Sequence, residues 1–201
     1  MITVIDGFTP FIDEVRESAL ASGFGTWRPS KGEVGSSVYE GMNFWGKHSV
    51  MLHALSYATG RPVFPNNMFF RVTNEDTEGA YVHSDRESGD FTCVVYLSDH
   101  GSVPTGTGFY RHRETGMTHM PSFAEMSDDK SFDSLKAQMV KGSDEDWELL
   151  DFVRGGYNRA VIFDAPRFHA RHPRHGISCT EEAGRMVWVC HFVTQLVKGN
   201  G

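Results

Sequence analysis

The feature that most limits the fold of this 201-residue chain is a succession of short β-forming runs in its second half. Each run is rich in aromatic and β-branched residues and is bounded by Gly, Asn, Asp or Pro, as half-buried strands are. The runs read NNMFFRVTN, GDFTCVVYLSD, GTGFYRHRE, NRAVIFDA and GRMVWVCHFVTQLV. Many short strands in succession predict a sheet that closes on itself or packs against a second sheet.

Two helices are expected before these strands. ITVIDGF predicts a short strand, and TPFIDEVRESALASG predicts a helix that Thr9 caps, Pro10 opens and Gly23 ends. The expected apolar residues of this helix are Phe11, Val15 and Leu20. SVMLHALSYATG predicts a second amphipathic helix that ends at its final glycine. We therefore expect an α+β fold, mainly β, with an N-terminal strand and helices in residues 1–67 and a strand-rich core in residues 68–195.

Residues 117–155 interrupt the strand pattern. Two stretches in this region, SDDKSFDSLKAQMVKG and DEDWELLDFVRGG, carry acidic residues toward their N-terminal ends, which favours helices through the helix dipole. They predict two surface helices, at residues 127–142 and 144–156.

A chain of this length fits one compact domain better than two independent cores. We therefore interpret residues 1–201 as a single domain with a helical insertion at about 117–155.

The composition argues against several classes of partner. Lys and Arg total 19 against 26 Asp and Glu, a formal charge of −7, which repels nucleic acid at long range. No apolar stretch approaches about eighteen residues, and the chain lacks a basic start followed by an apolar block, so no membrane span or secretory signal is expected. Three cysteines without C-x-x-C spacing, Cys93, Cys179 and Cys190, indicate free thiols. These observations together predict a cytoplasmic protein.

The stretch AYVHSD places a histidine and an aspartate two residues apart, just before a strand. Side chains alternate in extended backbone, so Tyr81, His83 and Asp85 are expected on one face. His83 and Asp85 can then bind one metal ion from the same side. The alternative is a polar turn before a strand, because an H-x-D pair also arises by chance in a chain with 10 histidines.

Three histidines compete for a third ligand position. His169 lies at the end of the run NRAVIFDAPRFHA, whereas His172 and His175 lie in ARHPRHG, a basic segment where solvated histidines are expected. Two histidines and one carboxylate occupy one face of an octahedron and leave three positions open, which suits non-haem Fe(II). Zinc sites more often close around four ligands or keep one water. The ligand set therefore favours Fe(II), with His169 as the third ligand and the two later histidines as alternatives.

The run AGRMVWVCHFV alternates strictly. One face is expected to carry Arg185, Val187, Val189 and His191, and the other Met186, Trp188, Cys190 and Phe192. A buried Arg185 needs a counter-charge, and a carboxylate matches its planar guanidinium at two points, so a dicarboxylic acid such as 2-oxoglutarate would satisfy it. Tyr96 can donate its hydroxyl to the same carboxylate. The alternatives are a surface salt bridge for Arg185 and core packing for Tyr96.

Taken in order, these motifs resemble those of the Fe(II)/2-oxoglutarate-dependent dioxygenases, in particular the prolyl-hydroxylase-like group and its small relatives in bacteria and phages. The resemblance covers about residues 68 to 195 and consists of YVHSD, VVYLS, GTGFYRHRETG, NRAVIFDAPRFHA and GRMVWVCHFV. It implies a double-stranded β-helix, or jelly roll, braced by N-terminal helices. It also implies Fe(II) held by His83, Asp85 and His169, and the distal carboxylate of 2-oxoglutarate held by Arg185 and Tyr96.

The resemblance further implies an activity. 2-Oxoglutarate and dioxygen would be consumed, with release of succinate and CO2, and a small molecule or peptide, such as a peptidyl proline or an amino-acid-like compound, would be hydroxylated. One departure concerns Val187, where the family often has a Ser or Thr as second partner of the carboxylate, so Tyr96 or another group must supply that hydrogen bond. The insertion is also longer than in minimal members. A non-catalytic jelly-roll binding module and a zinc hydrolase are the alternative functions.

Overall fold

The computed structural model describes residues 1–27, 39–43, 48–73, 81–98, 105–122, 125, 135, 143–174 and 185–194. The helices are α1 (Ile12–Ser22) and α2 (His48–Thr59), with two short 3-10 turns, η1 (Arg86–Ser88) and η2 (Asp144–Asp146). The strands are β1 (Ile2–Asp6), β2 (Gly25–Trp27), β3 (Tyr39–Asn43), β4 (Val63–Thr73), β5 (Phe91–Tyr96), β6 (Gly106–His112), β7 (Trp147–Arg154), β8 (Arg159–Asp164), β9 (His169–His172) and β10 (Arg185–Thr194).

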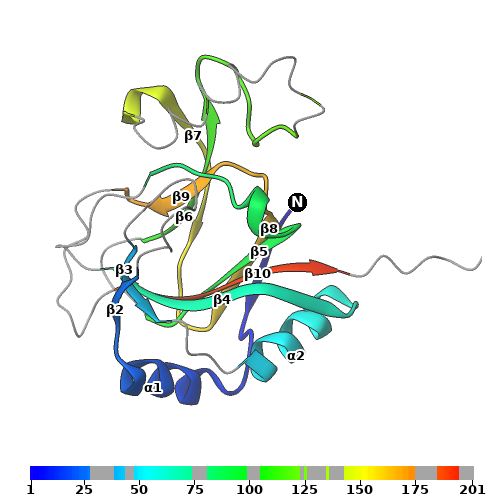
Figure 1. The fold of residues 1–201 in the computed structure, drawn as a ribbon, viewed down its shortest axis with the longest axis vertical. Helices are drawn as coiled ribbons and strands as arrows, with labels where there is room; N and C mark the ends of the chain where they lie inside the picture. Colours follow the sequence, from blue (N-terminus) through cyan, green and yellow to red (C-terminus); the bar gives the residue numbers. More distant parts are fainter. Residues whose placement is uncertain are drawn as a thin grey trace, which may run out of the picture.

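The strands form two antiparallel sheets that lie one above the other (Figure 1). The larger sheet has seven strands in the order β1-β8-β5-β10-β4-β3-β2, and the smaller has three in the order β7-β6-β9. An isolated antiparallel bridge between His83 and His169 adds the segment before β5 to the smaller sheet. The chain is therefore a mainly β jelly roll, as the sequence predicted.

Alternation along the two central strands separates two cores. One core lies on the helix side of the large sheet and includes Cys93, Val95, Met186, Trp188, Cys190 and Phe192. The other lies between the sheets and includes Val94, Tyr96, Phe109, Val161, Phe163, Val187 and Val189. The predicted faces of β5 and β10 are thus confirmed, because a pleated strand sends successive side chains to opposite sides.

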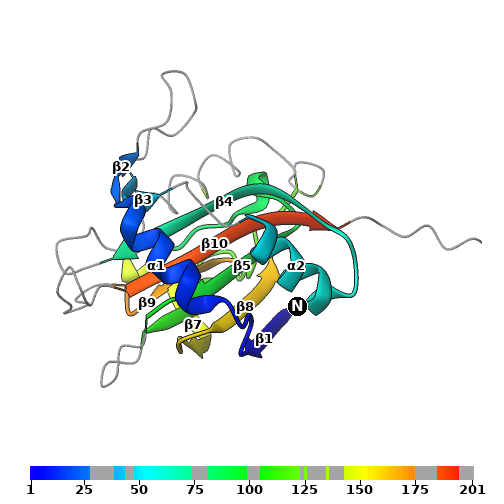
Figure 2. The ribbon, with the colours of Figure 1, turned by 90° about the horizontal axis from the view of Figure 1, so that it is seen from below.

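The two helices cover the outer face of the large sheet (Figure 2). Helix α1 ends at Gly23, whose φ is 71°, as predicted. It begins at Ile12 rather than at Pro10, and the Thr9 hydroxyl accepts a hydrogen bond from the Phe11 amide at 3.3 Å in the turn before it. The side chains that α1 buries are Ile12, Val15 and Ala19. This stripe, spaced by three and four residues, excludes the predicted Phe11 and Leu20, which are exposed.

The predicted helix at residues 144–156 is wrong, because residues 147–154 form strand β7. The acidic residues do mark a turn, but it is the single 3-10 turn η2, where Ser143 forms a capping box with Asp146. Strand β7 pairs with β6 along its length. Trp147 is buried at its start and packs edge-on against Phe168, with ring centroids 5.0 Å apart. Pairing and burial outweigh the local helical signal here.

Of the expected helix at residues 127–142, only Leu135 lies within the described residues, where it is buried. Cys93 and Cys190 face each other on β5 and β10 and are both free, buried thiols, as predicted, while Cys179 lies outside the described residues. Within the part of the chain that the structure describes, neither helix has the length and apolar character needed to cross a membrane.

Candidate metal centre

His83, Asp85 and His169 converge where the segment before β5 meets β9. One potential ligand atom of each side chain lies within 4.8 Å of the other two. The backbones of the two histidines exchange hydrogen bonds, from His83 N to His169 O at 3.0 Å and from His169 N to His83 O at 2.9 Å. Their ring centroids are 4.4 Å apart. Pairing between two distant segments therefore brings together the three residues that the sequence singled out.

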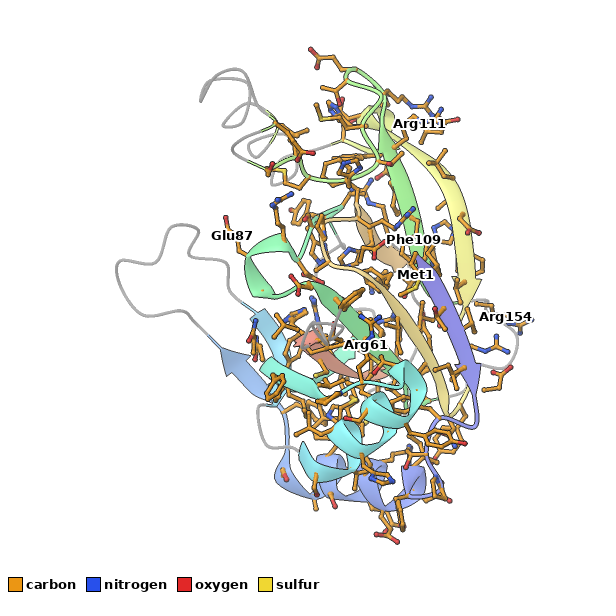
Figure 3. The ribbon with its side chains drawn as sticks, turned by 90° about the vertical axis from the view of Figure 1, so that its right-hand side faces the viewer. Met1, Arg61, Glu87, Phe109, Arg111 and Arg154 are labelled. Atoms are coloured by element: carbon orange, nitrogen blue, oxygen red, sulfur yellow. The ribbon has the colours of Figure 1, made fainter. Side chains whose placement is uncertain are left out.

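Asp85 reaches this cluster through a turn. Its φ of −96° and ψ of 18° end the extended segment immediately before η1, and its amide donates to Ala165 O at 2.9 Å. The extended segment therefore ends at Asp85, whose carboxylate still lies on the same side as His83, as predicted. Glu87, on that turn, lies at the edge of the molecule in Figure 3.

The tautomers of the two histidines follow from their backbone contacts. His83 Nδ1 lies 3.0 Å from Tyr81 O, and His169 Nδ1 lies 2.9 Å from Arg167 O. A carbonyl oxygen only accepts hydrogen bonds, so each Nδ1 carries the hydrogen and, in the neutral ring, each Nε2 presents a lone pair. His169 Nε2 is 3.2 Å from Asp85 Oδ2, and His83 Nε2 is 3.7 Å from Asp85 Oδ1. Two lone pairs and a carboxylate this close repel unless a cation or a proton lies between them.

The pKa of His83 agrees with a neutral ring, whereas the pKa of Asp85 describes the metal-free protein, in which a proton lies between the carboxylate and the neighbouring histidines. Desolvation, followed by repulsion from His169, lowers the pKa of His83 to about 4. The His83 side chain is still 49% exposed, and the contact of its Nδ1 with Tyr81 O opposes this lowering by raising the pKa. Burial alone would raise the pKa of Asp85, but the charges and hydrogen bonds of His169 and His191 outweigh it and hold that pKa well below its usual range. The cluster thus contains an ionised carboxylate beside a neutral imidazole at pH 7.

The other histidines considered for the third position do not join this cluster. His172 lies on β9, where its Nδ1 is 3.1 Å from the Tyr110 hydroxyl and its ring is 5.0 Å from that of Phe152. His175 lies outside the described residues. Within the described part of the chain, the cluster therefore contains His169 and not His172.

Arg185 and Tyr96 lie together between the two sheets. The Arg185 guanidinium carbon is 5.4 Å from the centre of the Tyr96 ring, and its Nη2 donates to Gly106 O at 3.2 Å. The Tyr96 hydroxyl lies 2.6 Å from Oγ1 of Thr107 on β6. All three side chains are buried, and burial raises the pKa of Tyr96, which keeps its hydroxyl protonated. Arginine and two hydroxyls form a set of hydrogen-bond donors suited to a carboxylate.

The register of β10 against β5 relates this group to the cluster. Val187 lies opposite Tyr96, Val189 opposite Val94, and His191 opposite Thr92, and these residues face the space between the sheets. Thr92 and His191 contact Asp85, so the cluster lies at one end of this inner face and Arg185 at the other. Phe109 lies within the body of the protein, whereas Arg111 on the same strand lies near the edge (Figure 3).

The family model described as "Family of unknown function (DUF6445)" matches residues 71–191, which is more than half of the chain. The chain belongs to this family. The matched region begins on β4 and ends on β10, so it contains all three clustered residues together with Arg185 and Tyr96. No curated protein sequence gives a significant match to this DUF6445 protein.

Several solved structures share the fold. HygX from Streptomyces hygroscopicus, solved with iron bound, is 11% identical, with a TM-score of 0.57 over 95% of this chain and 81% of HygX. The epimerase SnoN of nogalamycin biosynthesis, described as non-haem and alpha-ketoglutarate-dependent, is 12% identical, with a TM-score of 0.54 over 100% of this chain and 84% of SnoN. The carbocyclase SnoK of the same pathway is 16% identical, with a TM-score of 0.54 over 95% of this chain and 79% of SnoK. At these identities the likeness establishes the fold, and the narrower resemblance to the prolyl-hydroxylase-like group stays a prediction.

Two buried residues near Asp85 were not assigned a role from the sequence. Thr92 Oγ1 donates to Asp85 Oδ2 at 2.8 Å, and His191 Nε2 lies 3.2 Å from the same oxygen. Alternation placed His191 on the face of Arg185 but gave no partner for it. Thr107, which bonds Tyr96, was also missed, because it lies in the other sheet and only the packing of the sheets brings the two hydroxyls together.

Proposed function

We propose that this DUF6445 protein is a non-haem iron oxygenase that couples decarboxylation of 2-oxoglutarate to oxidation of an organic substrate. The observation that carries the proposal is the orientation of the two histidines: each Nδ1 contacts a backbone carbonyl, which leaves each Nε2 facing the carboxylate of Asp85. This arrangement needs a cation or a proton between the three groups, and it matches the two-histidine, one-carboxylate set that leaves three coordination positions open. HygX and SnoN, which share the fold, have been solved with iron and with iron and alpha-ketoglutarate, respectively.

The residues fit Fe(II). His83 and His169 would each supply Nε2, and Asp85 would supply a carboxylate oxygen, all from atoms within 4.8 Å of one another. The backbone carbonyls of Tyr81 and Arg167 hold the Nδ1 hydrogens and thereby keep each ring in the binding tautomer. When bound there with 2-oxoglutarate, Fe(II) supplies the activation of dioxygen and the oxidation of a C–H bond.

The protein residues at the far end of the inner face would bind and orient the cosubstrate. Arg185 would pair with the distal carboxylate, and whichever of the Tyr96 and Thr107 hydroxyls accepts the bond between them would donate its own hydrogen to that carboxylate. Thr107 supplies the second hydroxyl that Val187 cannot. Fixing one end of a flexible dicarboxylate lowers the entropic cost of presenting its other end in one geometry. Val94, Val189, Phe109 and Phe163 make the space between the two ends apolar and exclude bulk water.

The substrate is proposed to be a small molecule or a peptide, and hydroxylation is the expected outcome. The resemblance of the H-x-D, distal histidine and arginine motifs to prolyl-hydroxylase-like enzymes supports a peptidyl proline or an amino-acid-like compound. SnoN is described as an epimerase and SnoK as a carbocyclase, so this fold also supports other oxidative outcomes. The acidic balance, 26 Asp and Glu against 19 Lys and Arg, disfavours nucleic acid as substrate.

The test is anaerobic loading of the purified protein with Fe(II), followed by titration with 2-oxoglutarate. A weak visible charge-transfer band is expected for the wild type and for His172→Gln, and its loss is expected for Asp85→Ala and His169→Ala. A band that survives in His169→Ala but disappears in His172→Gln would place the third ligand at His172. Absence of the band in the wild type at saturating 2-oxoglutarate would refute the proposal.

A second measurement separates the other functions. On admission of air, the loaded wild type is expected to convert 2-oxoglutarate to succinate above the rate of free Fe(II). Binding of 2-oxoglutarate without any succinate would favour a non-catalytic binding module. Tight Zn²⁺ binding with no response to 2-oxoglutarate would favour a zinc hydrolase.

A further inference from the structure

His191 is a buried histidine beside the candidate ligands that belongs to neither the cluster of three nor the Arg185 group. Its Nε2 lies 3.2 Å from Asp85 Oδ2. The ring packs edge-on against Phe69, with centroids 5.8 Å apart. None of the described residues forms a hydrogen bond with its Nδ1, which is buried. The single polar contact that the described residues offer this ring is therefore the carboxylate of Asp85.

The strand geometry aims His191 at that carboxylate. His191 lies directly opposite Thr92 in the β10–β5 ladder, so the two side chains rise side by side from the inner face. On its other side β10 changes register against β4 between His191 and Phe192. Such bulges re-aim a side chain and recur beside functional sites. The cross-strand pair of Thr92 and His191 therefore places two polar side chains beside the carboxylate of Asp85.

Both groups meet the same oxygen. Thr92 Oγ1 is 2.8 Å from Asp85 Oδ2, and His191 Nε2 is 3.2 Å from it. Nδ1 of His191 has no acceptor among the described residues, and the ionised carboxylate beside Nε2 only accepts hydrogen bonds, so in the neutral ring Nε2 carries the hydrogen and its lone pair is not available to a metal. This tautomer is the opposite of that of His83 and His169, whose Nδ1 atoms donate to carbonyls. Oδ2 thus receives two hydrogen bonds and also lies 3.2 Å from Nε2 of His169, whereas Oδ1 accepts no hydrogen bond from the described residues and faces Nε2 of His83 at 3.7 Å.

We propose that His191 is a positioning residue for the metal centre. Together with Thr92 it holds Oδ2 of Asp85 by hydrogen bonds, so that Oδ1 is the atom that binds the metal and the carboxylate binds through one oxygen. This inference rests on the proposed function, since it requires a metal at His83, Asp85 and His169. It adds that a histidine outside the ligand set decides which carboxylate oxygen coordinates. Partners of this kind typically change metal affinity by about 10- to 100-fold.

Three substitutions of His191 separate its hydrogen bond from its volume. His191→Gln places an amide N–H near the position of Nε2 and is expected to keep metal affinity within about threefold of the wild type. His191→Asn is polar but too short to reach Oδ2, and His191→Leu has no donor. Both are expected to lose about 10- to 100-fold in affinity. His172→Gln, which changes a histidine that contacts Tyr110 and not Asp85, is the matched control.

The affinities are measured by anaerobic titration of each full-length variant with Mn²⁺, and thermal unfolding of the metal-free variants reports any loss of fold. Should the Leu variant not fold, the comparison of Asn with Gln carries the test. Equal affinities for Asn, Gln and the wild type would overturn the role of His191 while leaving the proposed function intact. A wild type that binds no Mn²⁺ would overturn both.

A crystal structure with Mn²⁺ gives a readout independent of affinity. In the wild type, Asp85 is expected to coordinate through Oδ1, with Oδ2 bonded to Thr92 and His191. In His191→Leu the freed Oδ2 is expected to move onto the metal and make the carboxylate bidentate. Coordination through Oδ2 in the wild type would overturn the inference.

Discussion

The hydroxyl groups of Tyr96 and Thr107 lie 2.6 Å apart and connect β5 of the large sheet to β6 of the small one. Both side chains are buried, so removal of either hydroxyl deletes a hydrogen bond that bulk water does not replace. Arg185 lies over the Tyr96 ring. The same pair therefore joins the two sheets and, in the proposed function, receives the distal carboxylate of the cosubstrate.

Replacement of Tyr96 by Phe is expected to weaken both stability and cosubstrate binding. It leaves the buried Thr107 hydroxyl without its partner, which should lower the free energy of unfolding by about 1–3 kcal/mol. The Kd for 2-oxoglutarate, measured calorimetrically on Mn²⁺-loaded protein, should rise by about tenfold, and Mn²⁺ affinity should stay unchanged. Urea unfolding of Thr107→Val and of the variant that carries both Tyr96→Phe and Thr107→Val completes a double-mutant cycle. Additive losses in stability would contradict the coupling of the two hydroxyls.

Arg185 is expected to determine the preference for a dicarboxylate. Arg185→Lys keeps the charge but loses two-point pairing, so the Kd for 2-oxoglutarate should rise by about 10- to 100-fold. The Kd for a 2-oxo acid without a distal carboxylate, such as 2-oxobutyrate, should change little. Arg111→Lys, which alters an exposed arginine paired with Glu148, is the control. If the ratio of the Kd for 2-oxobutyrate to the Kd for 2-oxoglutarate is the same in Arg185→Lys and the wild type, Arg185 does not bind the cosubstrate.

The metal-free protein is expected to lose stability as the pH falls from about 6.5 to about 4. The pKa of His83 is lowered to about 4, below its ordinary value of 6.5, so across this window the unfolded chain binds a proton that the folded chain does not. Stability therefore rises with pH between these values. Asp85, whose pKa is lowered, contributes in the same direction only at lower pH, below its ordinary pKa of 3.8.

Urea unfolding of the metal-free wild type and of His83→Gln at pH 7 and pH 4.5 isolates this contribution. The wild type should lose more stability than the variant between the two values, because Gln does not titrate. If the wild type and His83→Gln lose the same stability between pH 7 and pH 4.5, groups other than His83 produce the pH dependence. Since the His83 side chain is 49% exposed, we expect a modest difference.

Gly89 is expected to be essential for the approach of the Asp85 turn to β10. A Cβ at this position would lie 2.8 Å from the backbone oxygen of Phe192. This distance is too short for a carbon and an oxygen, so one of the two backbone segments would have to move. Gly89→Ala should therefore lower the free energy of unfolding by about 1–3 kcal/mol and weaken Mn²⁺ binding, because Phe192 follows His191. Ser88→Ala, one residue earlier, adds no atom and is the control. Equal unfolding curves for Gly89→Ala and the wild type would contradict the contact.

Local patterns in the sequence determined much of this protein. Strict alternation in GDFTCVVYLSD and GRMVWVCHFV predicted which side chains of β5 and β10 face the helices and which face the other sheet. Glycine predicted the end of α1 at Gly23. The H-x-D pair, the distal histidine and the arginine were recognisable in order. These features depend on the backbone repeat and on residue chemistry, which neighbouring residues in the sequence already fix.

Tertiary structure decided the features that depend on pairing between distant segments. Residues 147–154 carry helical signals but form β7, because β6 offers a partner and Trp147 a buried site. His169 rather than His172 joins the described cluster because its backbone pairs with His83. The contacts of His191 with Asp85 and of Thr107 with Tyr96 arise from strand register and sheet packing. Register is a long-range property of hydrogen bonding between strands, and no local pattern in this sequence encodes which polar atoms it brings together.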